Sequence, residues 1–231
     1  MLTLKDKILL FFDLLSDEPL FNPRRAVYST FSSYSPSSVD QRLRSLARKG
    51  LLKIDGRGPE GTVVISDSLR KSFEEGDFGI SRLRSSQKPW DGLWRLVVFD
   101  IAEENRSLRG LLRKKLKSLG FAMFQKSIWV TPFDVTHEIA KFLDETKIKG
   151  PVEVLEAKRL FAGDEGLWAR GAWHLDEINQ NYRDLLVKKD LTFDDYLKVK
   201  TEDSLLPMEL RPSPWFEDDL IKVLRNKIVE I

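Results

Sequence analysis

The sequence of 231 residues contains no cysteine, which excludes disulfide bonds, catalytic thiolates and cysteine-ligated zinc sites together. It has only two histidines, His137 and His174, and each is a lone histidine of the kind found more often in a surface or a core than in a metal site. No apolar run approaches the roughly 18 residues that a membrane-spanning helix needs. Residues 1–15 read as an amphipathic helix with no signal-peptide cleavage site after them. These absences predict a globular protein of the cytoplasm with no membrane partner.

Charge is unevenly distributed along the chain, although the net charge is only +2. Lys and Arg outnumber Asp and Glu by 15 to 11 in residues 1–89 and by 13 to 10 in residues 90–161, whereas residues 162–231 hold 10 basic and 15 acidic side chains. A basic front part of the chain is consistent with contact to a nucleic acid. A solvated surface explains charges of this size equally well, so charge alone does not decide the function.

The first part of the chain has the pattern of three helices followed by a β-hairpin. Apolar residues recur at helical spacing in residues 4–15, and Asn-Pro and Ser-Pro pairs start helices expected over 23–31 and 36–49. Gly50 ends the third helix. Two β-like runs, 51–54 and 62–65, are joined by a turn that contains three glycines. This order predicts an N-terminal winged helix-turn-helix domain over residues 1–68 and a linker over residues 69–89.

The expected helix 36–49 has a narrow apolar stripe, and its other faces are polar or basic, as in a helix that lies in the major groove of DNA. We expect base contacts from Ser37, Ser38, Gln41 and Arg44. Phosphate contacts or plain surface positions are expected for Arg24, Arg25, Arg42, Arg48 and Lys49, and Arg57 is expected near the wing tip. The alternative is an adaptor, because winged helices also bind proteins.

Residues 90–161 alternate between strand and helix patterns. The expected order is a strand over 93–101, a helix over 106–119, a strand pair over 122–131, a helix over 136–147 and a strand over 152–161. This β-α-β-β-α-β order is the ferredoxin-like arrangement. The fold class predicted for the chain is therefore α+β, with a ferredoxin-like dimerisation domain at its centre and a helical tail over residues 162–231.

The central segment resembles the CRISPR-adaptation ferredoxin-like endoribonuclease family. The resemblance is carried by Val97, Val98, Phe99, Asp100, Ile101, Leu108, Arg109, Leu116, Gly120, Phe121, Gln125, Lys126, Ser127 and Val130. It implies that Asp100, at the end of the first strand, binds Mg²⁺ or Mn²⁺ together with its partner across a dimer axis. A metal-dependent nuclease that uses Asp100 as its catalytic and metal-binding residue is thus one candidate function.

Nearly the whole chain resembles the PaaX family of transcriptional repressors. The matching positions are Trp90, Gly92, Trp94, Arg109, Leu112, Leu119, Gly120, Phe121, Trp129, Val130, Pro132, Leu206, Pro207, Glu209, Leu210, Pro212 and Trp215. The resemblance implies a non-enzymatic repressor that binds double-stranded DNA as a homodimer, without a cofactor. In phenylacetate-catabolism members of this family, an acyl-CoA thioester relieves repression, so a small-molecule effector of that kind is an expectation here. With two symmetric subunits, a palindromic operator is predicted.

The PaaX-like tail is expected to form helices over 167–186, 190–200 and 217–228. Its aromatic residues have two interpretations, which are packing against the central sheet or the walls of an effector pocket. For the second interpretation the candidates are Trp168, Trp173, Tyr182 and Trp215.

Overall fold

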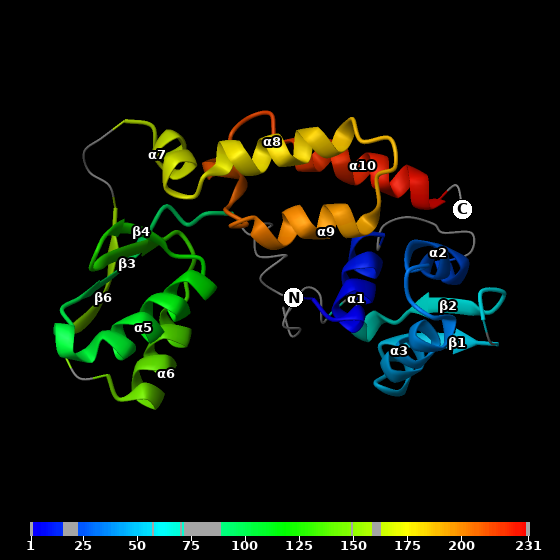
Figure 1. Cartoon of the computed structure of the whole chain (residues 1–231), viewed down its shortest axis with the longest axis horizontal. Helices are drawn as coiled ribbons and strands as arrows, with labels where there is room; N and C mark the ends of the chain where they lie inside the picture. Colours follow the sequence, from blue (N-terminus) through cyan, green and yellow to red (C-terminus); the bar gives the residue numbers. More distant parts are fainter. Residues whose placement is uncertain are drawn as a thin grey trace. The chain divides into compact units, whose positions relative to one another are not determined.

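The chain folds into two units that both combine helices with an antiparallel sheet, so the α+β class is confirmed. The computed structural model describes residues 2–15, 23–56, 58–69, 71, 89–148, 150–158 and 163–229. Unit 1 comprises residues 1–84, 178–203 and 214–231, and unit 2 comprises residues 85–177 and 204–213 (Figure 1). Among the described residues, no helix combines the length and the apolarity that crossing a bilayer requires.

The N-terminal part of unit 1 has the three helices and the hairpin expected from the sequence. These are α1 (Leu4–Leu14), α2 (Pro23–Thr30), α3 (Pro36–Arg48), β1 (Leu52–Asp55) and β2 (Thr62–Ile65), and the two strands pair antiparallel. The side chain of Ser35 accepts a hydrogen bond from the backbone N–H of Ser38 and caps α3, with Pro36 at the first helical position. Gly50 adopts a φ of 73°, a left-handed conformation that suits glycine and ends the helix.

Helix α1 is buried on more sides than its amphipathic pattern predicts, because helices from the tail of the chain pack on it. These are α9 (Phe193–Glu202) and α10 (Phe216–Val229), and α8 (Leu175–Leu186) packs on them in turn. Phe11 packs edge-on against Phe193 with ring centroids 5.8 Å apart, and the Arg225 side chain donates to the backbone oxygen of Leu14 at 2.8 Å. The tail helices therefore complete the core of unit 1.

The prediction of one continuous helix over 167–186 is wrong. The segment forms α7 (Glu165–Ala172) and α8, separated at Trp173 and His174, where His174 adopts a φ of 54°. A left-handed residue breaks a right-handed helix and turns the chain. The predicted tail domain, residues 162–231, is shared between the two units rather than forming a unit of its own.

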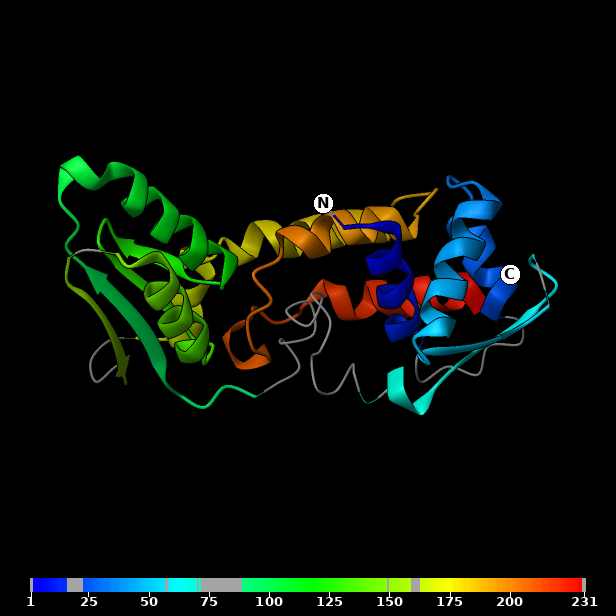
Figure 2. The same ribbon diagram turned by 90° about the horizontal axis from the view of Figure 1, so that it is seen from below.

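Unit 2 has the ferredoxin-like order. Its elements are β3 (Trp94–Phe99), the short 3-10 helix η2 (Glu103–Asn105), α5 (Arg106–Ser118), β4 (Ala122–Gln125), β5 (Ile128–Thr131), α6 (Thr136–Thr146), β6 (Val152–Ala157), α7 and the 3-10 helix η3 (Met208–Leu210). The sheet order is β4-β5-β3-β6, and all neighbouring strands are antiparallel. Helices α5 and α6 cover one face of the sheet (Figures 1 and 2), and Leu112, Leu116 and Ile139 meet Val97 and Trp129 in the core.

The other face of this sheet is only partly covered. At one end Trp94 is buried and packs against Trp168 and Trp173, with ring centroids 4.8 and 5.9 Å apart. The Trp173 indole N–H donates to the backbone oxygen of Gly120 at 3.0 Å, which fixes α7 against this end of the sheet. Further along the same face, the register places Leu96 opposite Leu155, whose side chain is 48% exposed.

Candidate nucleic-acid interface

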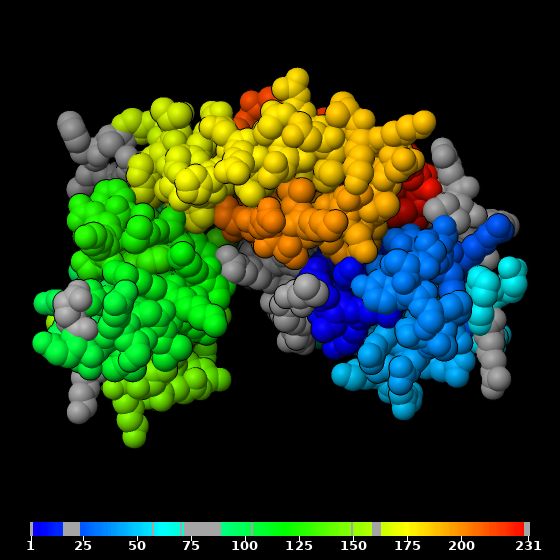
Figure 3. Space-filling view, viewed as in Figure 1, coloured from blue at the N-terminus to red at the C-terminus, as the bar shows by residue number. Residues whose placement is uncertain are grey.

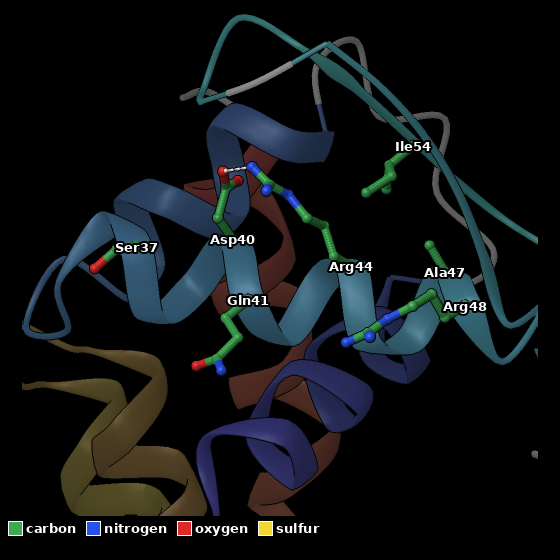
Figure 4. A pocket seen from close by; sticks show the side chains of 7 residues that line it. All are labelled: Ser37, Asp40, Gln41, Arg44, Ala47, Arg48 and Ile54. Atoms are coloured by element: carbon green, nitrogen blue, oxygen red, sulfur yellow. Dashed lines mark hydrogen bonds and ion pairs between the residues drawn. The ribbon is translucent and has the colours of Figure 1, made fainter.

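An open groove of about 790 Å³ runs along α3 in unit 1. One face of the helix lines it at positions three, four and seven residues apart, and Ile54 of β1 closes one side (Figure 4). The lining residues are Ser37, Asp40, Gln41, Arg44, Ala47, Arg48 and Ile54. The groove thus joins one polar face of α3 to the first strand of the hairpin.

A carboxylate within the groove organises its basic groups. Arg44 donates to Asp40 Oδ2 at 2.7 Å, an i, i+4 ion pair that Figure 4 shows along the helix. Asp40 Oδ1 accepts from Arg24 Nη2 at 3.0 Å and also from the hydroxyl of Tyr28. Burial by itself raises the pKa of Asp40, but the hydrogen bonds from Tyr28, Arg24 and Arg44 outweigh it and lower this pKa below its ordinary value. Asp40 is therefore ionised at neutral pH and holds cations on two sides.

Arg24 is a structural residue, which corrects the expectation of a phosphate contact or a surface position. Its side chain is 0% exposed. Besides Asp40 it reaches the hairpin, where Nη1 donates to the backbone oxygens of Asp55 at 2.8 Å and Gly56 at 3.2 Å. One guanidinium thus connects α2, α3 and the end of β1, and no room remains for a phosphate beside it.

The other predicted contact residues divide into two sets. Ser37, Gln41, Arg44 and Arg48 share the groove, whereas Ser38, Arg42 and Lys49 stand on the neighbouring stripe of α3. Arg25 is exposed on α2, and Arg57 lies outside the described residues. The serine hydroxyls of Ser37 and Ser38 both contact the capping hydroxyl of Ser35, at 3.1 and 2.8 Å. Sequence reasoning missed Asp40, although its spacing of four residues from Arg44 is a signal for an ion pair.

The four aromatic residues expected to line one effector pocket belong to two different units. Trp168 and Trp173 pack with Trp94 in unit 2, while Tyr182 and Trp215 pack against each other in unit 1 with centroids 5.7 Å apart. Of the four, Trp168 lines an open groove of about 460 Å³ with Met123, Phe124, Val130, Leu167, Gly171 and Ala172. Most of these aromatic side chains therefore have the packing role that was the alternative interpretation.

Tyr182 and Trp215 also take part in a buried polar network. Glu217, 2% exposed, accepts from Lys200 at 2.6 Å, from Tyr196 at 3.0 Å and from the Trp215 indole at 3.2 Å. The Tyr182 hydroxyl donates to Asp203 at 3.0 Å. Burial and the nearby carboxylates raise the pKa of Tyr182 and of Tyr196 well above the ordinary value, so both phenols stay neutral. These contacts hold α8, α9 and α10 together.

Asp100 directly follows β3 and is exposed. Its backbone N–H donates to Pro151 at 3.0 Å, and its carbonyl oxygen lies 2.9 Å from where a side chain would start at Gly150. Within the described parts of the chain, no three His, Asp or Glu side chains are grouped so that they could hold a metal ion. A metal at Asp100 therefore depends on ligands that a single described chain does not bring there.

Comparison with known proteins finds a family model that matches part of this chain and a solved structure with a similar fold. Residues 87–167 match the family model described as the PaaX protein central Cas2-like domain. A solved structure, the uncharacterized protein Rv0674 from Mycobacterium tuberculosis, has a TM-score of 0.52 and 18% identity, covering 96% of this chain and 93% of that one. At that identity the likeness establishes the fold alone. No curated protein matches this chain. The resemblance to the PaaX family is thus confirmed for residues 87–167, which match the Cas2-like central domain of that family.

Proposed function

We propose that this protein is a PaaX-like transcriptional regulator that binds double-stranded DNA through α3. The observation that carries the proposal is the groove along α3, where Gln41, Arg44 and Arg48 lie on one face beside a hairpin strand. Three helices followed by a two-stranded hairpin is the element order of a winged helix-turn-helix, in which the third helix enters the major groove. The PaaX central domain in the same chain supports a regulatory role.

The chemistry of the groove suits base recognition. A glutamine amide pairs with adenine through two hydrogen bonds, and arginine pairs in the same way with guanine. Arg44 is held toward Asp40, with 48% of its side chain exposed, so it starts from a defined position instead of a mobile one. The charged residues that line the groove, Asp40, Arg44 and Arg48, sum to +1, which favours an anionic partner. Arg42 and Lys49, on the neighbouring stripe, are then the candidates for phosphate contacts.

We also propose that the regulator is a homodimer, joined through the sheet face of unit 2 that the core helices leave uncovered. Leu96, Val98 and Ile128 are partly exposed on this face, and Leu155 is 48% exposed. Apolar side chains grouped on one sheet face lose contact with water when a second copy covers them. A twofold axis makes the two α3 helices equivalent, which leads to a palindromic operator.

For a small-molecule effector such as an acyl-CoA, the groove beside Trp168 has the most suitable chemistry. It combines one indole with the exposed side chains of Met123, Phe124 and Leu167. Apolar and aromatic walls suit an acyl chain. In this proposal, an added acyl-CoA quenches tryptophan fluorescence and lowers DNA affinity, and Trp168→Ala removes both responses. An acyl-CoA that changes neither would remove this groove from the proposal.

The test of DNA binding uses purified protein and labelled genomic fragments, first in EDTA and then in Mg²⁺, with the same gels read for cleavage. Discrete, salt-sensitive shifts with intact DNA are expected. Arg44→Gln combined with Arg48→Gln is expected to change the preferred operator sequence, whereas Arg42→Gln combined with Lys49→Gln weakens binding to all sequences uniformly. Lys198→Gln combined with Lys222→Gln, at exposed positions on α9 and α10, is the charge-matched control.

Two results would overturn the proposal. If the Arg44 and Arg48 double variant binds the same sequences with unchanged affinity, α3 does not read DNA. If nucleic acid is cleaved only with Mg²⁺ and Asp100→Asn abolishes the cleavage, the protein is instead a nuclease.

A further inference from the structure

Helix α5 of unit 2 carries an unusual concentration of positive charge. Its 13 residues, Arg106–Ser118, include six Lys or Arg and no Asp or Glu. Together with Lys126 in the turn between β4 and β5, residues 105–133 hold seven cations. All ten acidic residues of the segment 90–161 lie outside residues 105–133. A solvated helix usually mixes the two signs, so this one-sided composition needs an explanation.

Most of these cations share one face of α5. Arg106, Arg109, Arg113 and Lys117 recur at spacings of three, four and four residues, and Lys114 borders the same stripe. Leu112 and Leu116, which are fully buried in the core, lie on the face next to these cations, three and seven residues after Arg109. Lys115 does not belong to the stripe, because its ammonium group lies 5.8 Å from the centre of the Phe142 ring on α6. We call the five side chains on the outer face the α5 basic stripe.

A glycine interrupts the middle of the α5 basic stripe. Gly110 follows Arg109, and a Cβ added there would meet no atom of the described residues within 4 Å. Glycine within a helix costs about 0.5–1 kcal/mol relative to alanine, and packing against the described part of the chain does not require it. Its effect is to leave the helix backbone bare between cations, where another molecule can approach closely.

The turn after β4 extends the charged surface. Arg113 donates through Nη2 to the backbone oxygen of Lys126 at 2.9 Å, which holds the β4–β5 turn against α5. Lys126 itself is exposed, and so are Arg106, Lys114 and Lys117. Figure 3 shows α5, coloured bright green, as part of the outer surface of its unit. The surface is therefore accessible and held in a defined shape.

We propose that the α5 basic stripe binds the phosphate backbone of duplex DNA, as a second contact surface separate from the groove of α3. From Arg106 to Lys117 the stripe spans about 16 Å at 1.5 Å per residue, long enough to meet several phosphates. Cations without an apolar anchor between them favour a phosphate backbone over a protein partner, whose recognition depends on buried aromatic or aliphatic side chains. This inference rests on the proposed DNA-binding function and adds a contact that carries no sequence information.

The experiment compares two triple variants of the full chain. Arg106→Gln, Lys114→Gln and Lys117→Gln together neutralise three exposed members of the stripe. Lys141→Gln, Lys147→Gln and Lys158→Gln together make the same change of charge at exposed positions on α6, just after it, and just after β6. Thermal unfolding of all variants checks that the fold is retained. The affinity for operator duplexes with long flanks is then measured over a series of salt concentrations.

The stripe variant is expected to lower the slope of log affinity against log salt by about 2–3, since each lost phosphate contact removes roughly 0.9 from it. Its affinity at low salt is expected to fall at least 10-fold, with the order of preferred sequences unchanged, while the control variant behaves like the wild type. A stripe variant with the wild-type slope overturns the inference.

The variants of α3 separate this outcome from failure of the proposed function. If the stripe variant keeps its slope while the Arg44 and Arg48 variant changes operator preference, the inference fails and the proposed function stands. If the stripe variant loses binding while the α3 variants do not, α3 is not the reading helix and the stripe is the contact surface. A wild-type chain that binds no duplex overturns both.

Discussion

Replacing Asp40 by alanine is expected to destabilise unit 1 by about 2–3 kcal/mol. The carboxylate pairs at 3.0 Å with Arg24, whose side chain is 0% exposed, so its removal leaves a buried guanidinium without its counter-ion. Breaking a buried pair in this way typically costs about 3–5 kcal/mol. The smaller value follows from two features, since Asp40 retains 16% exposure and Arg24 keeps its hydrogen bonds to the carbonyls of Asp55 and Gly56.

The matched control is Arg44→Gln, which removes the other partner of the same carboxylate. Arg44 pairs with Asp40 at the shorter distance of 2.7 Å, but 48% of its side chain is exposed. An exposed ion pair on a helix contributes only about 0.3–0.5 kcal/mol. Burial and not distance therefore sets the order of the two effects. Arg24→Met combined with Asp40→Ala is expected to recover part of the loss, because no buried charge is then left unpaired.

The distribution of aromatic residues provides the assay. All four tyrosines belong to unit 1, and five of the six tryptophans belong to unit 2. Urea unfolding followed by the near-ultraviolet tyrosine signal thus reports on unit 1, and tryptophan fluorescence reports mainly on unit 2. Asp40→Ala is expected to shift the tyrosine transition with little change in the fluorescence transition. If Arg44→Gln costs as much as Asp40→Ala, the reasoning from burial is refuted.

The same carboxylate gives unit 1 a defined pH dependence. The pKa of Asp40 is lowered in the folded chain from its ordinary value of 3.8, so its contribution is complete above that value. The contribution disappears as the pH falls below 3.8 and through the folded pKa. Wild type and Asp40→Ala are therefore expected to differ in stability at pH 7 and to converge in strong acid, and a difference that persists there would contradict the assignment.

Three further changes test other parts of the structure. Gly61→Ala is expected to cost about 1–3 kcal/mol of unit 1 stability, as a Cβ there lies 2.2 Å from Arg24 Nη1, and wild-type urea unfolding would contradict it. Glu217→Ala is expected to destabilise more than Lys200→Met, because the buried Lys200 ammonium then loses its counter-ion, whereas Glu217 without Lys200 still accepts from Tyr196 and the Trp215 indole; the reverse order would refute that account. Leu155→Asp is expected to give monomers in light scattering, and an unchanged dimer would place the interface elsewhere.

Local sequence signals predicted most elements of the two units. The Ser35-Pro36 start, the Val39, Leu43 and Leu46 stripe and Gly50 defined α3 almost to the residue, because capping and periodicity act over a few neighbouring positions. The same kind of pattern predicted the β-α-β-β-α-β order of unit 2, which the antiparallel sheet β4-β5-β3-β6 confirms. The break at His174 was missed because a histidine carries no sequence signal for a left-handed conformation.

The residues of the candidate interface show that local sequence patterns do not predict which side chains the fold buries. Periodicity predicted that the polar faces of this helix carry Ser37, Ser38, Gln41 and Arg44 as base contacts, but only the structure showed that Arg48 and not Ser38 shares the groove. Arg24 is expected from the sequence to contact a phosphate or to lie on the surface, whereas the fold buries it between Asp40 of α3 and the end of β1. The role of Asp40 likewise depends on three partners, one of them 16 residues away.

By itself the sequence determined the elements, their order, the absence of thiol chemistry and the one-sided charge of α5, since these follow from residue type and short-range spacing. Only the tertiary structure decided that α9 and α10 pack on α1, where Phe193 meets Phe11 across 182 positions of the chain. It also decided that Trp168 and Tyr182 belong to different units. Such contacts depend on the joint burial of apolar surfaces distant in sequence, which no local pattern specifies.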